Sequence, residues 1–148
     1  HPLPPYGIYQ QAKGILKNYG LAMLSFPALN GWYYIVVKHR NALETWSSAP
    51  VFLSGLFGSY DFSLASTQAF GANQSMIAPG LWAFYSGDVV KDPSESTDLA
   101  DISKVQVDIN TYAFGYEVSD ITGDGNVDLL DMPLLENNVN SFVFVHHP

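Results

Sequence analysis

The chain has 148 residues, enough for one domain of ordinary size or two small ones, and a hydrophobic content of 47% excludes a disordered chain. It contains no cysteine, which excludes disulfides, thiol catalysis and zinc–cysteine sites. No run approaches the roughly 18 to 20 apolar residues of a membrane helix, and no basic stripe indicates nucleic-acid binding. We therefore expect no membrane span and no nucleic-acid partner.

The net charge of −8 is very uneven along the chain. Residues 1–87 carry a net charge of +2, whereas residues 88–148 carry −10. Most of the acidic residues in the second part are aspartates at regular spacing, so the acidity indicates a binding site there and not a general property of the surface. The chain begins with His1 instead of Met, and we expect it to be a mature, proteolysed or trimmed product.

Short apolar segments separated by Gly, Pro and Asn predict strands throughout residues 1–86, beginning almost at His1. The strongest is Trp32–Lys38, which is rich in aromatic and β-branched residues. The other predicted strands are Leu21–Phe26, Val51–Leu53, Ser59–Phe62 and Gly80–Ser86, and Leu64–Phe70 is predicted as a helical turn.

This spacing favours an antiparallel β-sandwich over residues 1–86. The predicted sandwich is one or two strands short, and an uncovered sheet edge invites pairing with another chain. We therefore expect strand addition, by a protein partner or by identical subunits.

One polar group in this part is a candidate site: His39 and Arg40, followed by Glu44 and Trp46. One interpretation is a platform for a cell-surface glycan, with a tryptophan stacked on a sugar ring. The other, which we favour, is a strand end and turn in which Arg40 pairs with Glu44. Glu44 and Asp61 are the only carboxylates in residues 1–86, so a glycosidase pair is not expected, and we predict no catalytic residues and no enzyme.

Two stretches farther on match the spacing of a calcium loop. Such a loop needs oxygen ligands at positions 1, 3, 5, 9 and 12, a backbone carbonyl at position 7, and glycine at position 6. The first stretch fits in part, with two extra residues within 93–97, and its candidate ligands are Asp88, Asp92, Asp98 and Asp101. It has Val90 at a ligand position and Pro93 at the turn position. The first loop is therefore the weaker candidate for calcium.

The second stretch, residues 120–131, fills the whole pattern. Its side-chain ligands would be Asp120, Thr122, Asp124, Asp128 and Asp131, with Asn126 supplying the carbonyl and Gly125 the turn. Four carboxylates this close repel one another unless a hard cation lies between them. The sequence therefore predicts Ca²⁺ here.

Each loop leads into a helical pattern. Leu99, Ile102, Val105 and Ile109 have helical spacing, as do Leu130, Leu134, Leu135 and Val139. The aspartate before each run can cap its helix. The second loop–helix follows the first at an offset of 30 residues, which indicates an internal duplication.

A resemblance covers nearly the whole chain. The run Tyr33–Ser47, the Tyr60-Asp61-Phe62 motif and the Trp82–Asp88 junction, followed by two calcium loops, resemble the carboxyl-terminal module of large secreted surface proteins of Bacteroidota. In that family such segments lead into dockerin-like, EF-hand-like calcium repeats. The resemblance implies an extracellular or cell-surface location and calcium, and it implies no catalytic activity. The first loop departs from the family pattern.

We therefore predict a mainly β chain with a small α part: an antiparallel β-sandwich over residues 1–86, then a dockerin-like calcium-binding pair over residues 87–148. The predicted function is that of a calcium-stabilised extracellular structural or adhesive module, part of a cell-surface assembly. The alternatives are a sorting or anchoring module recognised by a secretion system, and a carbohydrate-binding module.

Overall fold

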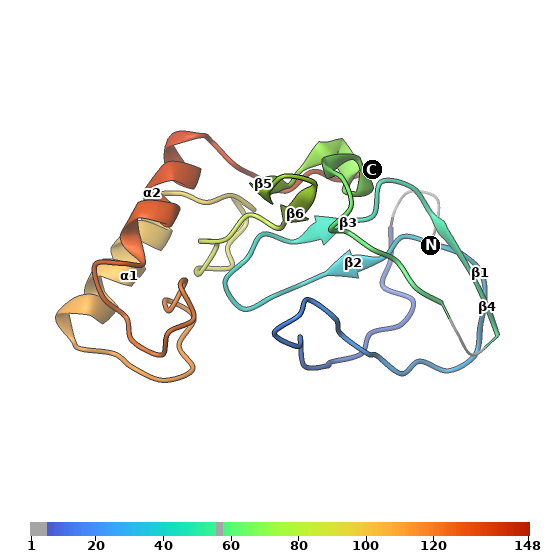
Figure 1. The fold of residues 1–148 in the computed structure, drawn as a ribbon, viewed down its shortest axis with the longest axis horizontal. Helices are drawn as coiled ribbons and strands as arrows, with labels where there is room; N and C mark the ends of the chain where they lie inside the picture. Colours follow the sequence, from blue (N-terminus) through green and yellow to red (C-terminus); the bar gives the residue numbers. More distant parts are fainter. Residues whose placement is uncertain (1–5, 56–57) are drawn as a thin grey trace. The chain divides into compact units, whose positions relative to one another are not determined.

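The structure, a computed structural model, describes residues 6–55 and 58–148. The expected strand at the very amino end begins outside the described residues. The chain divides into two compact units, residues 1–35 with 49–61, and residues 36–48 with 62–148 (Figure 1). Residues 36–48 and 62–86 thus group with the acidic carboxyl-terminal part.

The first unit contains one two-stranded antiparallel sheet. Strand β1, Leu29–Tyr33, pairs with β4, Val51–Gly55, and Trp32 lies opposite Phe52. A second hairpin turns between Lys17 and Leu21, where the Lys17 N–H donates to the Leu21 carbonyl at 2.8 Å. No described residue of this unit is buried. Its apolar side chains therefore form no core among themselves.

The predicted continuous strand Trp32–Lys38 is wrong. The chain leaves β1 after Tyr33 and starts β2, Val36–Val37, which pairs with β3, Thr45–Trp46, in a different sheet. Aromatic and β-branched residues favour strand conformation at every position of this run. They do not say which partner strand each residue will meet, and here the partner changes within the run.

The second unit contains two small antiparallel sheets, β2–β3 and the hairpin of β5, Ser75–Ala78, with β6, Leu81–Ala83. The helical turn predicted within Leu64–Phe70 is confirmed by the 3₁₀ helix η1, Ser66–Gln68, and a second 3₁₀ helix, η2, follows at Phe70–Ala72. The segments Leu21–Phe26 and Ser59–Phe62 were predicted as strands and form none.

Both predicted helices are present in the second unit and lie side by side (Figure 1). Helix α1 spans Leu99–Asn110 and α2 spans Met132–Asn140. Val105 and Leu135, which are equivalent in the duplication, are both fully buried in one apolar cluster. A second cluster of Leu43, Val143 and Val145 packs the carboxyl-terminal segment against residues 43–46.

The described residues thus form short antiparallel strands in two-stranded sheets together with two helices. The antiparallel strands of the prediction are confirmed at this level, in a mixed fold of short strands and two helices. No two-layer sandwich is formed by residues 6–55 and 58–148, because each sheet is limited to two strands. No helix in the described part of the chain is long and apolar enough to cross a membrane.

Candidate metal centre

The two loops are closed by the same hydrogen bonds. In the first loop Asp101 accepts the N–H groups of Val89 and Val90 with one oxygen, each at 2.8 Å, and that of Asp98 with the other. In the second loop Asp131 accepts the N–H groups at the equivalent positions, from Ile121, Thr122 and Asp128, at 2.8 to 3.0 Å. Asp101 is 1% exposed and Asp131 is 0% exposed, so each buried carboxylate is held by three backbone donors. The duplication seen in the sequence is therefore also a duplication of geometry.

Each loop is also bridged to the segment that follows a helix. The Thr97 N–H donates to the Val143 carbonyl at 2.9 Å, and the equivalent Val127 N–H donates to the Ala113 carbonyl at 3.1 Å. Isolated bridges join Ser96 to Phe144 and Asn126 to Phe114, where Asn126 lies 30 residues after Ser96 and Phe114 lies 30 residues before Phe144. The first loop is thus tied to the end of the second helix unit, and the second loop to the end of the first. This crossed pairing makes the two loop–helix units one body.

In the second loop, Asp120 organises the turn. Its carboxylate accepts the Gly123 N–H at 2.7 Å with one oxygen and the Gly125 N–H at 3.2 Å with the other. Gly125 has φ of +90°, a left-handed conformation that glycine adopts without strain. Asp124 accepts the Asn126 N–H at 2.8 Å. Gly125, which the sequence predicts as the turn residue, therefore has the backbone conformation that the turn requires.

Asp128 lies where the chain enters the second helical segment, and its carboxylate accepts the Leu130 N–H at 2.7 Å. The equivalent Asp98 caps α1, accepting the Ala100 N–H at 2.8 Å, and with Asp101 forms a reciprocal capping box. The predicted capping is confirmed for α1. The residue directly before α2, Asp131, makes no side-chain cap because its oxygens bind the loop N–H groups.

The start of the second loop is anchored to residues 40–41. Asn41 donates its amide N–H to the Asp120 carbonyl at 2.8 Å, and Arg40 Nη2 donates to the same carbonyl at 3.3 Å. The guanidinium lies 3.6 Å from the Asp120 carboxylate and 4.3 Å from the centre of the Tyr116 ring. Arg40 therefore fixes where the loop begins and lowers the local negative charge.

The first loop has a different cation. The Lys91 ammonium lies 2.8 Å from Asp88 Oδ2 and 2.7 Å from the carbonyl oxygen of Ala42. Burial raises the pKa of Asp88, and the Lys91 hydrogen bond and charge act against that rise. The Gly87 N–H donates to the Asn41 carbonyl at 2.7 Å. Residues 40–42 thus contact the beginnings of both loops.

The remaining candidates of the first loop are already engaged in hydrogen bonds within the loop. Asp92 is half-buried and accepts the Ser94 N–H at 2.7 Å, and hydrogen bonds from Ser94 lower its pKa. Burial raises the pKa of Asp101, against the effect of its three N–H donors. Asp98 is used as the cap. This loop has Val90 where the second has the Thr122 hydroxyl, and Lys91 binds its Asp88 carboxylate, so it offers a smaller oxygen set than the second.

Within residues 6–55 and 58–148, no group of three or more His, Asp or Glu side chains lies together so as to hold a metal ion. The fit of calcium is therefore judged from donor chemistry. In the second loop three carboxylates, those of Asp120, Asp124 and Asp128, have acceptor capacity beyond their bonds within the loop, since an ionised carboxylate offers about four acceptor positions. Oxygen donors of this kind suit calcium. Thr122 adds a hydroxyl, so the second loop contains the types of oxygen donor that calcium takes.

The polar group near His39 is arranged differently from the prediction. Glu44 pairs with Lys38 at 2.6 Å and accepts the Trp46 indole N–H at 2.7 Å, so the predicted Arg40–Glu44 pair is wrong. Arg40 and Glu44, the charged residues of the predicted turn, instead bind different partners, because Arg40 pairs with Asp120 in the acidic second loop. The Trp46 ring is half-buried and meets His147 edge-on, with ring centres 5.6 Å apart.

Comparison with protein-family models, with curated proteins and with solved structures finds no match for this chain. Sequence reasoning missed the roles of Arg40 and Lys91. For Lys91 a signal was present, since it follows Asp88 by three residues, but for Arg40 no spacing in the sequence indicates Asp120 as its partner.

Proposed function

We propose that this chain is a non-enzymatic, calcium-stabilised extracellular module with a structural or adhesive role in a cell-surface assembly. Calcium binds in the second loop, and residues 87–148 act as a dockerin-like pair of loop–helix units. The observation that carries the proposal is the duplicated closure of the two loops around Asp101 and Asp131. The Bacteroidota resemblance supports the extracellular location.

The energetic argument for calcium rests on charge. The second loop gathers Asp120, Asp124, Asp128 and Asp131 within twelve residues, and the nearby Arg40 contacts only Asp120 among them. A divalent cation bound by the loop would offset the repulsion that remains. Extracellular modules bind calcium with dissociation constants of roughly 0.1 to 1 mM. Calcium at about 10 mM would then stabilise the folded chain by about 1.4 to 2.7 kcal/mol.

Thermal unfolding of the whole chain with calcium and with a chelator tests the proposal. We expect the wild-type chain to melt at a temperature higher by on the order of 5 °C in about 10 mM calcium. Asp124→Ala should abolish most of that shift. The matched control is Asp92→Ala, at the equivalent position of the first loop, which should keep it. A wild-type melting temperature that does not respond to calcium would falsify the proposal.

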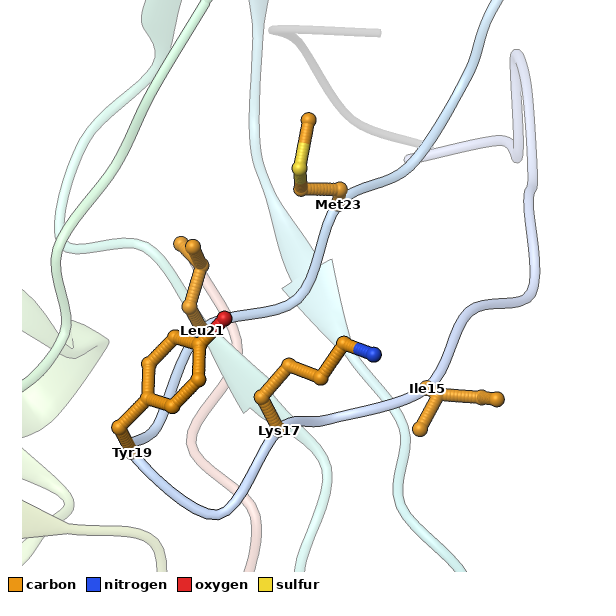
Figure 2. Close-up of a pocket in the computed structure, with 5 residues that line it drawn as sticks. All are labelled: Ile15, Lys17, Tyr19, Leu21 and Met23. Atoms are coloured by element: carbon orange, nitrogen blue, oxygen red, sulfur yellow. The ribbon is translucent and has the colours of Figure 1, made fainter.

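The first unit supports the assembly part of the proposal. Trp32 and Phe52 face each other across β1 and β4 and are still 58% and 50% exposed. Figure 2 shows Ile15, Tyr19 and Met23 along the Lys17–Leu21 hairpin, where each is at least 71% exposed. Within the described residues β1 and β4 pair only with each other, so each has a second edge for an added strand. We infer that a second copy of the chain or another protein adds strands here and completes a sandwich.

A further inference from the structure

The first loop is closed like the second but lacks several of its oxygen and N–H groups. Thr122 supplies a hydroxyl in the second loop, whereas the equivalent Val90 has an apolar side chain. Gly125 donates an N–H to Asp120 at 3.2 Å, whereas the equivalent Pro93 has no N–H to donate. The position-1 aspartate of the first loop, Asp88, therefore needs a different donor.

That donor is Lys91. Its equivalent in the second loop is Gly123, whose N–H donates to Asp120 at 2.7 Å. The Lys91 side chain reaches the same position-1 carboxylate, at 2.8 Å from Asp88 Oδ2, and adds a full positive charge. Asp88 is only 5% exposed, so its charge requires a close counter-ion.

The ammonium is held in place from a second side. Lys91 Nζ donates to the Ala42 carbonyl at 2.7 Å, and the chain around Ala42 is fixed by the Leu43 N–H, which donates to the Tyr85 carbonyl at 2.9 Å. The ammonium thus lies between a loop carboxylate and a backbone carbonyl. These are the oxygen types that a calcium ion takes as ligands.

We propose that the Lys91 ammonium takes the place of calcium in the first loop, so that the chain binds one calcium ion and carries its second cation built in. This inference deepens the proposed function and rests on it for the calcium in the second loop. The first loop then folds without metal and supports α1 at any calcium concentration. The second loop alone responds to the ion.

Calcium bound per chain, measured by equilibrium dialysis at saturating calcium, gives the first test. We expect one ion for the wild-type chain, one for Asp88→Asn and none for Asp124→Ala. Two ions in the wild-type chain, or one ion retained by Asp124→Ala, would show that the first loop binds calcium and would overturn the proposal.

A double-mutant cycle in chelator gives the second test and needs no calcium. Lys91→Met leaves the buried Asp88 unpaired, so its melting temperature should fall. Adding Asp88→Asn should recover a large part of that loss, because the amide carries no charge. Losses that simply add, or no loss for Lys91→Met, would contradict the pairing.

The calcium count and the double-mutant cycle also distinguish the proposed function, calcium in the second loop, from the role of Lys91 in the first loop. If the wild-type chain binds no calcium at all, the proposed function fails, and the cycle in chelator still decides whether Lys91 is the counter-ion of Asp88.

Discussion

The carboxylates of Asp101 and Asp131 hold the two loops closed, each with three backbone N–H donors. An amide at either position keeps one acceptor oxygen and turns an NH₂ group towards N–H donors. Asp101→Asn and Asp131→Asn should therefore each lower the free energy of unfolding by about 1–3 kcal/mol in chelator.

The two variants should differ once calcium is added. Asp131 is a proposed ligand, so Asp131→Asn should also lose the stabilisation by calcium, whereas Asp101→Asn should keep it. Urea unfolding with and without calcium measures both effects. An equal loss of the calcium effect in the two variants would contradict the different roles of the two loops.

His39 gives the site a pH dependence. Burial lowers the pKa of His39 below the ordinary histidine value of 6.5, and the neighbouring charges of Arg40 and Lys91 lower it further, against a hydrogen bond with Asn41. Because the unfolded chain then binds the proton more readily, the folded state loses stability as the pH falls from about 6.5 towards the lower folded pKa.

Replacing His39 should remove this loss. His39→Gln is expected to show a smaller decrease of the urea midpoint between about pH 7 and about pH 5 than the wild-type chain. Parallel pH profiles for the two proteins would argue against a lowered pKa at His39.

At the scale of elements, each helix is followed, just after its C-cap residue, by an exposed aromatic residue with a left-handed backbone. Tyr112 and Phe142 are equivalent in the duplication, with φ of 54° and 52°, and they are 86% and 83% exposed. Glycine is the usual residue at this position because it has no Cβ. Tyr112→Gly should therefore raise the free energy of unfolding by about 0.5–1 kcal/mol.

The control is Phe114→Gly, two residues farther on. Phe114 is 78% exposed and is not among the residues with positive φ, so glycine there should be destabilising, by about 0.5–1 kcal/mol. Chemical denaturation of both variants measures the difference. A destabilising Tyr112→Gly would show that the aromatic ring compensates the strain by contacts within the chain.

The elements differ in how far the sequence predicts them. Helices α1 and α2 were predicted because their period of apolar residues depends only on local spacing, and Val105 and Leu135 are buried as that period requires. The run Trp32–Lys38 predicted strand conformation but not its division between β1 and β2, since strand pairing is a long-range property.

For the candidate metal centre, too, the sequence predicts local features but not long-range contacts. The Gly125 turn and the Asp98 cap follow from residue type and spacing, and both are present. The contact of Arg40 with Asp120 joins residues 80 positions apart, and no local pattern contains it. Glu44, which local reasoning assigned to Arg40, is instead bound by Lys38.

For the whole molecule, the absence of any buried residue in the described part of the first unit predicts assembly. Light scattering of the chain in millimolar calcium should give a mass above the 16.3 kDa of one copy. The variant Trp32→Ser with Phe52→Ser removes two exposed aromatic side chains and should shift the mass towards one copy. A wild-type chain that stays a single copy at high concentration would contradict self-assembly.

The central claim is that the second loop binds calcium. Calorimetric titration of calcium into the wild-type chain should give one site per chain, with a dissociation constant of roughly 0.1 to 1 mM. Asp124→Ala should give no binding heat, and Asp92→Ala should reproduce the wild-type curve. The absence of heat with the wild-type chain, or an unchanged curve with Asp124→Ala, would contradict the account.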